Sequence, residues 1–146
     1  MASTAIPALK SAILASLEVD PTPEGLEGVA ISGDKEPTRS SEYVWLYKGK
    51  AQREFKLIGG RPSKLNEEVR IFLRVLVVKG DQAEAESRAL AIAEAVEGIL
   101  RDLEPEDDEA QFLKPLLVEE LEDEPLQFDQ KAACHVLMTV VTEARI

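Results

Sequence analysis

Two periodic stretches follow each other near the middle of the chain and set the frame of the predicted fold. In the first, every odd position is apolar, which is the period of a β-strand with one buried face. These positions are Val69, Ile71, Leu73, Val75 and Val77. The even positions begin with Arg70 and end with Leu76 and Val78, so the second face should be wet at one end and covered at the other. The pattern predicts a central strand over residues 69–79.

The second stretch has the period of an amphipathic helix. Asp81 followed by Glu84 has the form of a capping box, in which the side chains accept hydrogen bonds from backbone N–H groups at the helix start. The apolar residues that follow recur at helical spacing and form one stripe. They are Ala85, Ala89, Ile92, Ala93, Val96, Leu100 and Leu103. We expect a long helix that starts after Asp81, lies close to the sheet through its alanines, and ends at Pro105.

The patterns before this frame predict one helix and three short strands. They are a helix over residues 5–17, capped by Ser3 or Thr4, and strands over residues 26–32, 43–47 and 52–58. Lys48-Gly49-Lys50 has turn chemistry, so the last two strands should form a hairpin, followed by a loop over residues 59–64. Because this hairpin has few expected neighbours, we predict that it projects from the sheet.

Three further segments complete the predicted order. Residues 104–109 are acidic and are interpreted as a solvated linker, and a strand over residues 116–122 should stop at the acidic residues before Pro125. The last strand, over residues 132–146, carries apolar residues on both faces and should pair beside the strand 69–79. The predicted fold class is α+β, a mostly antiparallel sheet with two helices packed on one face and a projecting β-hairpin, in a single domain of residues 1–146.

Composition narrows the class of protein. A chain of 146 residues can bury a core of its own. Its single cysteine, Cys134, excludes an internal disulfide and fits a reducing compartment. The sequence has no apolar run long enough to span a membrane, and its start lacks the pattern of a signal peptide. We therefore expect a soluble, non-secreted protein with no membrane partner.

The formal charge of −11 is unevenly distributed. Residues 102–129 hold twelve acids and one base, a net of −11, whereas residues 34–79 hold eleven bases and six acids, a net of +5. The molecule should therefore be electrically two-sided. Such polarity suits head-to-tail contact between copies, where opposite patches meet.

The sequence offers little for catalysis or metal binding. His135 is the only histidine, and its neighbour Cys134 should point to the opposite face of a strand, so the two cannot form a dyad. Structural zinc needs about four nitrogen or sulfur ligands, which the chain lacks. The loop 59–64 does not have the spacing of a phosphate loop, and the acidic run 119–124 lacks the order of a calcium loop. We predict no enzyme activity, no catalytic residue, no metal and no cofactor.

The candidate functional residues belong instead to the predicted hairpin and its loop. Aromatic and basic side chains are gathered there in a protein that is only 5% aromatic. They are Tyr43, Trp45, Tyr47, Lys48, Lys50, Arg53, Lys56, Arg61 and Lys64. Such residues are enriched in protein interfaces, although the three rings could also simply cap the core. A site for single-stranded nucleic acid is the weaker interpretation, because the whole chain is acidic.

The layout of these elements resembles the tail terminator (tail completion, minor tail) proteins of long-tailed bacteriophages. The resemblance rests on Glu67-Glu68-Val69-Arg70-Ile71-Phe72-Leu73, then Gly80-Asp81-Gln82-Ala83-Glu84-Ala85-Glu86 and Ile99-Leu100-Arg101. It implies a homohexameric ring in the tail or neck of a virion, assembled in the host cytoplasm. Such a ring would bind the tail tube protein on one side and the head-neck connector protein on the other. DNA would only pass through its lumen, without sequence-specific binding.

Two alternatives and one mechanism accompany this resemblance. Neck proteins that join head to tail have a similar layout, so a neck connector is the alternative function. A small-molecule-binding or catalytic α+β domain is the other alternative, and it would need a deep pocket lined by convergent polar groups. For the ring, we hypothesise that the basic region 48–64 of one copy contacts an acidic surface, such as that of residues 104–124, on its neighbour.

Overall fold

A computed structural model describes residues 4–58, 61–107, 110–128 and 131–145, with the backbone alone at 54–58, 61–65 and 128. These residues form two helices and six strands. They are α1 (Ile6–Leu17), β1 (Ala30–Ser32), β2 (Glu42–Ile58), β3 (Arg61–Val78), α2 (Gln82–Arg101), β4 (Gln111–Phe112), β5 (Leu117–Phe128) and β6 (Lys131–Arg145). The fold is α+β, as predicted.

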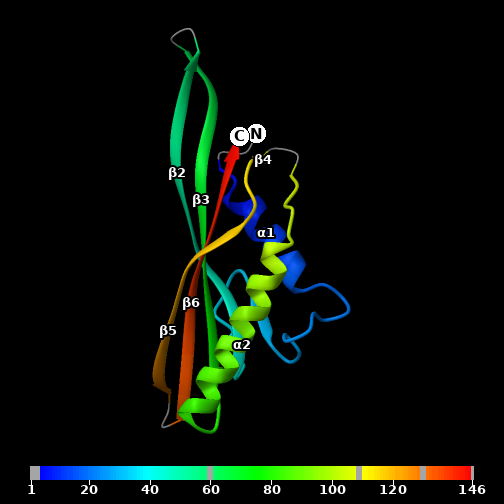
Figure 1. Ribbon diagram of the computed structural model, residues 1–146, viewed down its shortest axis with the longest axis vertical. Helices are drawn as coiled ribbons and strands as arrows, with labels where there is room; N and C mark the ends of the chain where they lie inside the picture. The colour runs from blue at the N-terminus through cyan, green and yellow to red at the C-terminus, as the bar shows by residue number, and fades with distance from the viewer. Residues whose placement is uncertain (1–3, 59–60, 108–109, 129–130, 146) are drawn as a thin grey trace.

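The strands form one sheet in which β3 is central. The order is β1-β2-β3-β6-β4, and β5 also pairs with β6. Every pair is antiparallel except β1 with β2. The predicted pairing of the last strand beside residues 69–79 is confirmed, since Val69 lies opposite Thr142 and Val78 opposite Ala133. Figure 1 shows the β2–β3 hairpin rising well past the end of the other strands.

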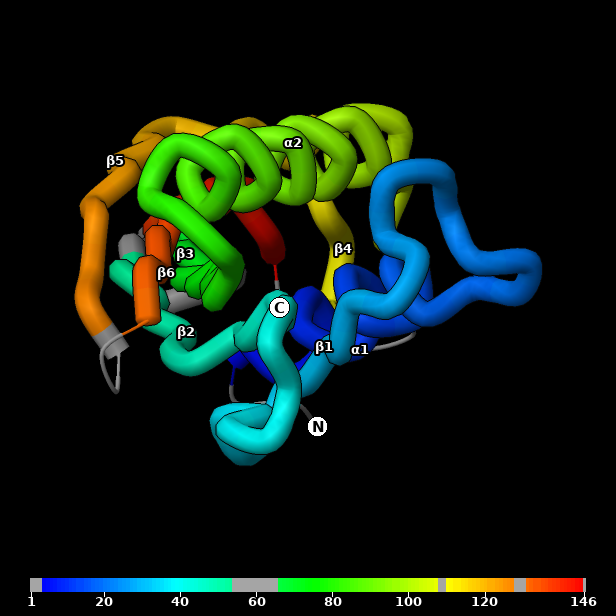
Figure 2. Tube along the Cα trace, turned by 90° about the horizontal axis from the view of Figure 1, so that it is seen from below, coloured from blue at the N-terminus to red at the C-terminus, as the bar shows by residue number. Residues whose placement is uncertain are grey.

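Both helices pack on the same face of the sheet, as predicted. The odd-numbered apolar residues of β3 between Val69 and Val77 are fully buried, and they share one core with buried side chains of both helices. In the view of Figure 2, α2 lies along one side of the curled sheet and α1 lies beside β1. The face that carries these odd residues is therefore the core face. The opposite face is called the outer face below.

The long helix begins where its capping residues predict. Asp81 is the N-cap, and its side chain accepts a hydrogen bond from the backbone N–H of Glu84 at 2.8 Å. The predicted apolar stripe is the buried face from Ala85 to Leu100. The helix ends at Arg101, a few residues before Pro105. Small alanines on the stripe let the helix axis lie close to the strands beneath it.

The predicted hairpin turn at residues 48–50 is wrong. Strand β2 runs without a turn from Glu42 to Ile58, and near these residues its pairing with β3 shifts register only at a bulge between Leu46 and Lys48. Gly49 is needed for a different reason, because a Cβ built there would lie 2.5 Å from Cγ2 of Ile6 in α1. The projecting hairpin is therefore β2 with β3. The predicted loop 59–64 is reduced, since β3 already starts at Arg61, and Gly59 and Gly60 lie outside the described residues.

Four other boundaries differ from the sequence prediction. The expected strand 26–32 is confined to β1, and the short strand β4 was not predicted. Strand β5 does not stop at its acidic residues but continues through Pro125. Proline and charge are tolerated there because β5 lies at the edge of the sheet. Helix α1 has Ala5 at its N-cap position, without a side-chain cap.

Candidate assembly surface

The β2–β3 hairpin divides into a supported part and a free arm. Strand β6 pairs with β3 only as far as Asn66, which lies opposite Arg145. Beyond that point β2 and β3 pair with each other alone, from Phe55 opposite Leu65 to Ile58 opposite Arg61. We call residues 55–58 and 61–65 the arm. The arm includes Lys56, Arg61 and Lys64, for which the structure describes the backbone and not the side chains. Their predicted contact role therefore stays a prediction.

A buried glutamate ties the base of this arm to helix α1. Glu67 is 1% exposed, and its Oε1 accepts hydrogen bonds from the hydroxyl of Thr4, at 2.7 Å, and from the backbone N–H of Ala5. Arg53 of β2 donates through Nε to the other carboxylate oxygen at 3.3 Å. A carboxylate at a helix start satisfies free N–H groups and is favoured by the helix dipole. Thr4 also contributes at this helix start, as predicted, because its hydroxyl oxygen accepts a hydrogen bond from the Ile6 N–H at 3.3 Å, whereas Ser3 lies outside the described residues.

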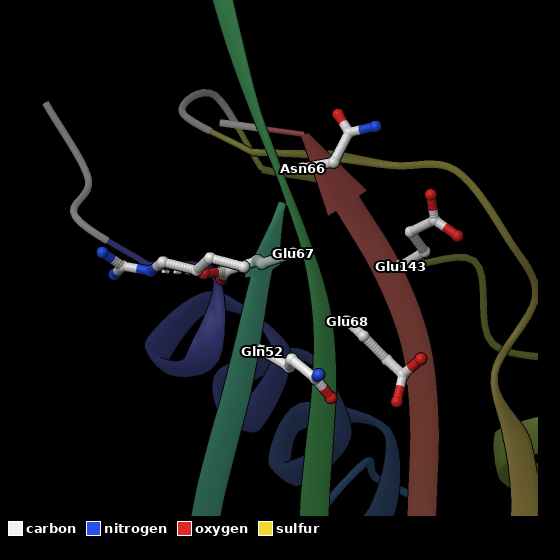
Figure 3. Close-up of a pocket in the computed structure, with 6 residues that line it drawn as sticks. Gln52, Asn66, Glu67, Glu68 and Glu143 are labelled. Atoms are coloured by element: carbon white, nitrogen blue, oxygen red, sulfur yellow. Dashed lines mark hydrogen bonds and ion pairs between the residues drawn. The ribbon is translucent and has the colours of Figure 1, made fainter. Parts of the chain in front are cut away.

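The next residue along β3 faces the other way. Figure 3 shows Glu67 pointing toward the start of α1, whereas Glu68 and Glu143 lie on the opposite side of the sheet. A cavity of about 360 Å³ lies at this place, lined by Gln52, Arg53, Asn66, Glu67, Glu68 and Glu143. Glu68 pairs with Arg70, and Glu143 pairs with Lys114 at 2.8 Å. The cavity at the foot of the arm is therefore lined by polar and charged side chains, and its three glutamates each form an ion pair.

The aromatic residues share the outer face, as their alternation predicts. The rings of Trp45 and Tyr47 are 5.6 Å apart between centroids, and Tyr47 is 6.3 Å from Phe72 of β3. Nζ of Lys48 lies 5.3 Å from the centroid of the Phe72 ring, a cation–π contact. Tyr47, with 37% of its surface exposed, and Lys48 are open to solvent. Phe72 was not among the predicted residues, although its even position on β3 places it on this face.

Tyr43 lies on the same face but is covered by the loop before β2. It is 1% exposed, and its hydroxyl donates to a carboxylate oxygen of Glu36 in that loop. Nη1 of Arg74 donates to the same oxygen at 2.9 Å and to the Tyr43 hydroxyl oxygen at 3.2 Å. Burial first, and the bond to Glu36 next, raise the pKa of Tyr43 above its ordinary range. Tyr43 is therefore part of the folded body and offers no surface of its own.

The single histidine continues this network to the sheet edge. Nε of Arg74 donates to Nδ1 of His135 at 3.1 Å, and Nε2 of His135 lies 3.0 Å from a carboxylate oxygen of Glu124 on β5. Because Nδ1 accepts from arginine, the proton of the neutral ring is placed on Nε2, toward Glu124. Cys134 points to the core face, as predicted, and burial raises the pKa of its thiol. His135 and Cys134 are thus built into the fold on opposite faces.

Strand β5 presents the acidic counterpart of the basic hairpin. Its carboxylates are all exposed, and they are Glu119, Glu120, Glu122, Asp123 and Glu124. Glu119 forms an ion pair with Arg70, and Glu124 lies within hydrogen-bond distance of Nε2 of His135. Within the described residues, Glu120, Glu122 and Asp123 form no ion pair. Leu117 and Leu121 of the same strand are also exposed, at 63% and 43%.

The rest of the described surface offers no centre for a metal ion or a membrane. The described residues hold no group of three or more His, Cys, Asp or Glu side chains placed to bind a metal ion. Of the two described helices, neither is long and apolar enough to cross a membrane. A hollow of about 440 Å³ lies between α1 and β1 and includes Lys10, Leu14 and Ile31 in its lining. It is a surface groove at the side of the molecule away from β5.

Comparison with known proteins gives a likeness in fold. No protein-family model matches the sequence, and no curated protein matches it. A chain in the solved structure described as the virion of a native gene transfer agent (GTA) particle is similar, with a TM-score of 0.73 and 16% sequence identity. The match covers 99% of this chain and 100% of that chain. The likeness therefore extends over the whole fold.

Proposed function

We propose that this chain is a structural protein of a bacteriophage-like virion, which forms a ring that ends the tail tube and joins it to the head-neck connector. The observation that carries the proposal is the end-to-end likeness in fold to a chain of a gene transfer agent virion. With nearly all of both chains matched, the likeness extends past a common core to the edge strands and the hairpin. The resemblance to tail terminator proteins gives the narrower role, and a hexamer is the expected ring.

The surface chemistry supports a role in assembly. The outer face carries aromatic and basic side chains, of which Tyr47, Lys48 and Lys50 are exposed in the single chain. Strand β5 carries exposed carboxylates at the far edge of the same sheet. Interfaces between proteins are enriched in aromatic residues, and complementary charges set their orientation. A ring built head to tail needs two different patches on each copy, which this sheet supplies.

Two measurements test the proposal. Native mass spectrometry of the purified chain should give a closed oligomer, with six copies expected. The oligomer should then co-sediment with tail tubes of the same virus and should not co-sediment with isolated heads that carry no tail. Binding to such heads alone would assign the chain to the neck. A single subunit at high concentration that binds neither particle would overturn the proposal.

A further inference from the structure

Two edges of the sheet are open in the single chain. On the edge of β2 that points away from β3, the only described strand is β1, which pairs with Tyr43 to Trp45. The described part of β2 from residue 46 onward therefore has one open edge. Strand β5 pairs with β6 and, among the described strands, with no other. Open edges present backbone N–H and C=O groups that can pair with another strand. Each copy thus carries two edges of similar length, at opposite sides of one sheet.

The directions of the strands allow these two edges to meet. Strands β2, β3, β6 and β5 are neighbours in that order, and each pair is antiparallel. Strand β5 therefore runs opposite to β2. When copies stand side by side in the same orientation, β5 of one copy lies antiparallel to β2 of the next. Antiparallel pairing is the more stable of the two ladders.

The side chains along the edges are complementary on the same face. Lys48 lies opposite Phe72, and Lys50 opposite Arg70, so both lysines belong to the outer face. Glu120 lies opposite Thr139 and Glu122 opposite Leu137, which belong to the same face. Side chains on one face of adjacent strands are neighbours, and opposite charges there stabilise the pair. The lysines of one copy would therefore stand beside the glutamates of the other.

The sign of the charges argues for mutual pairing. A lone protein also protects its sheet edges with charge, and a single sign on both edges would serve that purpose. Here residues 46–53 of β2 contain bases and no acid, whereas residues 117–127 of β5 contain acids and no base. Each edge repels its own kind and attracts the other. This arrangement disfavours a two-fold dimer and favours a head-to-tail ring.

From these observations we infer that the open edge of β5 pairs with the open edge of β2 in a second copy of this chain, so that the sheets of neighbouring copies join into one. The inference rests on the proposed ring and names the contact that closes it. Lys48 and Lys50 of one copy face Glu120 and Glu122 of the next. Leu117 and Leu121, exposed in the single chain, are covered at this junction.

Paired charge reversals test the inference. Variant A carries Lys48→Glu and Lys50→Glu, and variant B carries Glu120→Lys and Glu122→Lys. Native mass spectrometry should find each variant dispersed, because the side chains at positions 48 and 50 of one copy and 120 and 122 of the next now carry the same sign. A mixture of A and B should recover rings in which the two variants alternate. Rings of wild-type size from A alone and from B alone would overturn the inference.

Two controls distinguish strand pairing from a general effect of surface charge. Glu86→Lys with Glu94→Lys makes the same change of charge as variant B on exposed positions of α2, and its rings should persist. Amide hydrogen exchange should be slower in β5, and in β2 at residues 46–53, in wild-type rings than in dispersed variant A. Equal exchange rates, or a wild-type chain that stays a single subunit, would also overturn the inference. Rings that behave as described yet bind no tail tube would leave the inference standing and would refute only the proposed function.

Discussion

The two faces of the sheet are formed by alternating residues of the same strands, but only one face is covered by helices. On β3, Ile71 and Leu73 are fully buried under helices of the same chain. The even-numbered residues Phe72 and Arg74 of the same strand are half-buried on the outer face. They contact other side chains of the sheet and the loop before β2. The core face is closed by the chain itself. The outer face leaves aromatic side chains and charges partly open to solvent, and the proposed contact between copies lies at the edges of this sheet.

The largest difference in stability between the two faces is expected at the adjacent residues Leu73, on the core face, and Phe72, on the outer face. Leu73→Ala should lower the free energy of unfolding by about 2–5 kcal/mol, because it leaves a cavity in the buried core. Phe72→Ala removes a larger ring, but one that is already partly in water, and should cost less than half as much. Urea denaturation of dispersed chains measures both. Equal losses would mean that the outer face supports the fold as strongly as the core does.

A smaller effect is expected at the adjacent pair Glu67 and Glu68. Glu67→Ala leaves the Thr4 hydroxyl and the Ala5 N–H without their acceptor and should cost about 1–3 kcal/mol. Glu68→Ala removes an ion pair with Arg70 at the surface and should cost about 0–1 kcal/mol. Amide exchange at the start of α1 should rise in the first variant alone.

A third variant keeps this prediction specific. Glu67→Gln retains the oxygen that accepts from both Thr4 and Ala5, but it replaces the oxygen that accepts from Arg53 with an amide NH2 and removes the charge. Its stability should therefore lie between wild type and Glu67→Ala. Should Glu67→Ala leave the first turn of α1 as protected as in wild type, the carboxylate does not hold the helix in place.

The same two faces explain which parts of the fold the sequence predicts. The core face follows from short-range patterns, since a period of two on β3 and a capped helical stripe on α2 are both written in consecutive residues. The parity of β3 also extends to Glu67, which could have been assigned to the core face on that signal. Its partners could not, because Thr4 and Ala5 are brought to it only by the packing of α1.

Errors concentrate at the edges, where local chemistry and tertiary structure disagree. Lys48-Gly49-Lys50 has the composition of a turn, but Gly49 is required by the close approach of Ile6 while the strand continues past it. The acidic residues before Pro125 resemble a break, but an edge strand with exposed side chains on both sides needs no apolar alternation. The predicted contact residues lie on β2 and β3, and their role stays a prediction; among them, Tyr43 is covered by a loop of its own chain.

Tyr43 is the outer-face aromatic residue that its own chain buries, and the pH dependence of stability can measure how firmly it is buried. Its pKa is raised in the folded chain, mainly by burial, so between about pH 10 and that raised value the unfolded chain has lost a proton that the folded chain keeps. The contribution of Tyr43 to stability is then complete below about pH 10 and is lost as pH rises above it, by at most about 1.4 kcal/mol per pH unit. Tyr43→Phe lacks this proton.

The difference in free energy of unfolding between wild type and Tyr43→Phe should therefore be constant from neutral pH to about pH 10 and should shift against wild type above it. Chemical denaturation at a series of pH values gives this difference, and the other titrating groups cancel because both proteins contain them. A difference that stays constant well above pH 10 would mean that the hydroxyl ionises as freely in the folded chain as in the unfolded one. The loop over Tyr43 would then open readily, and this end of the outer face would be as exposed as the Tyr47 end.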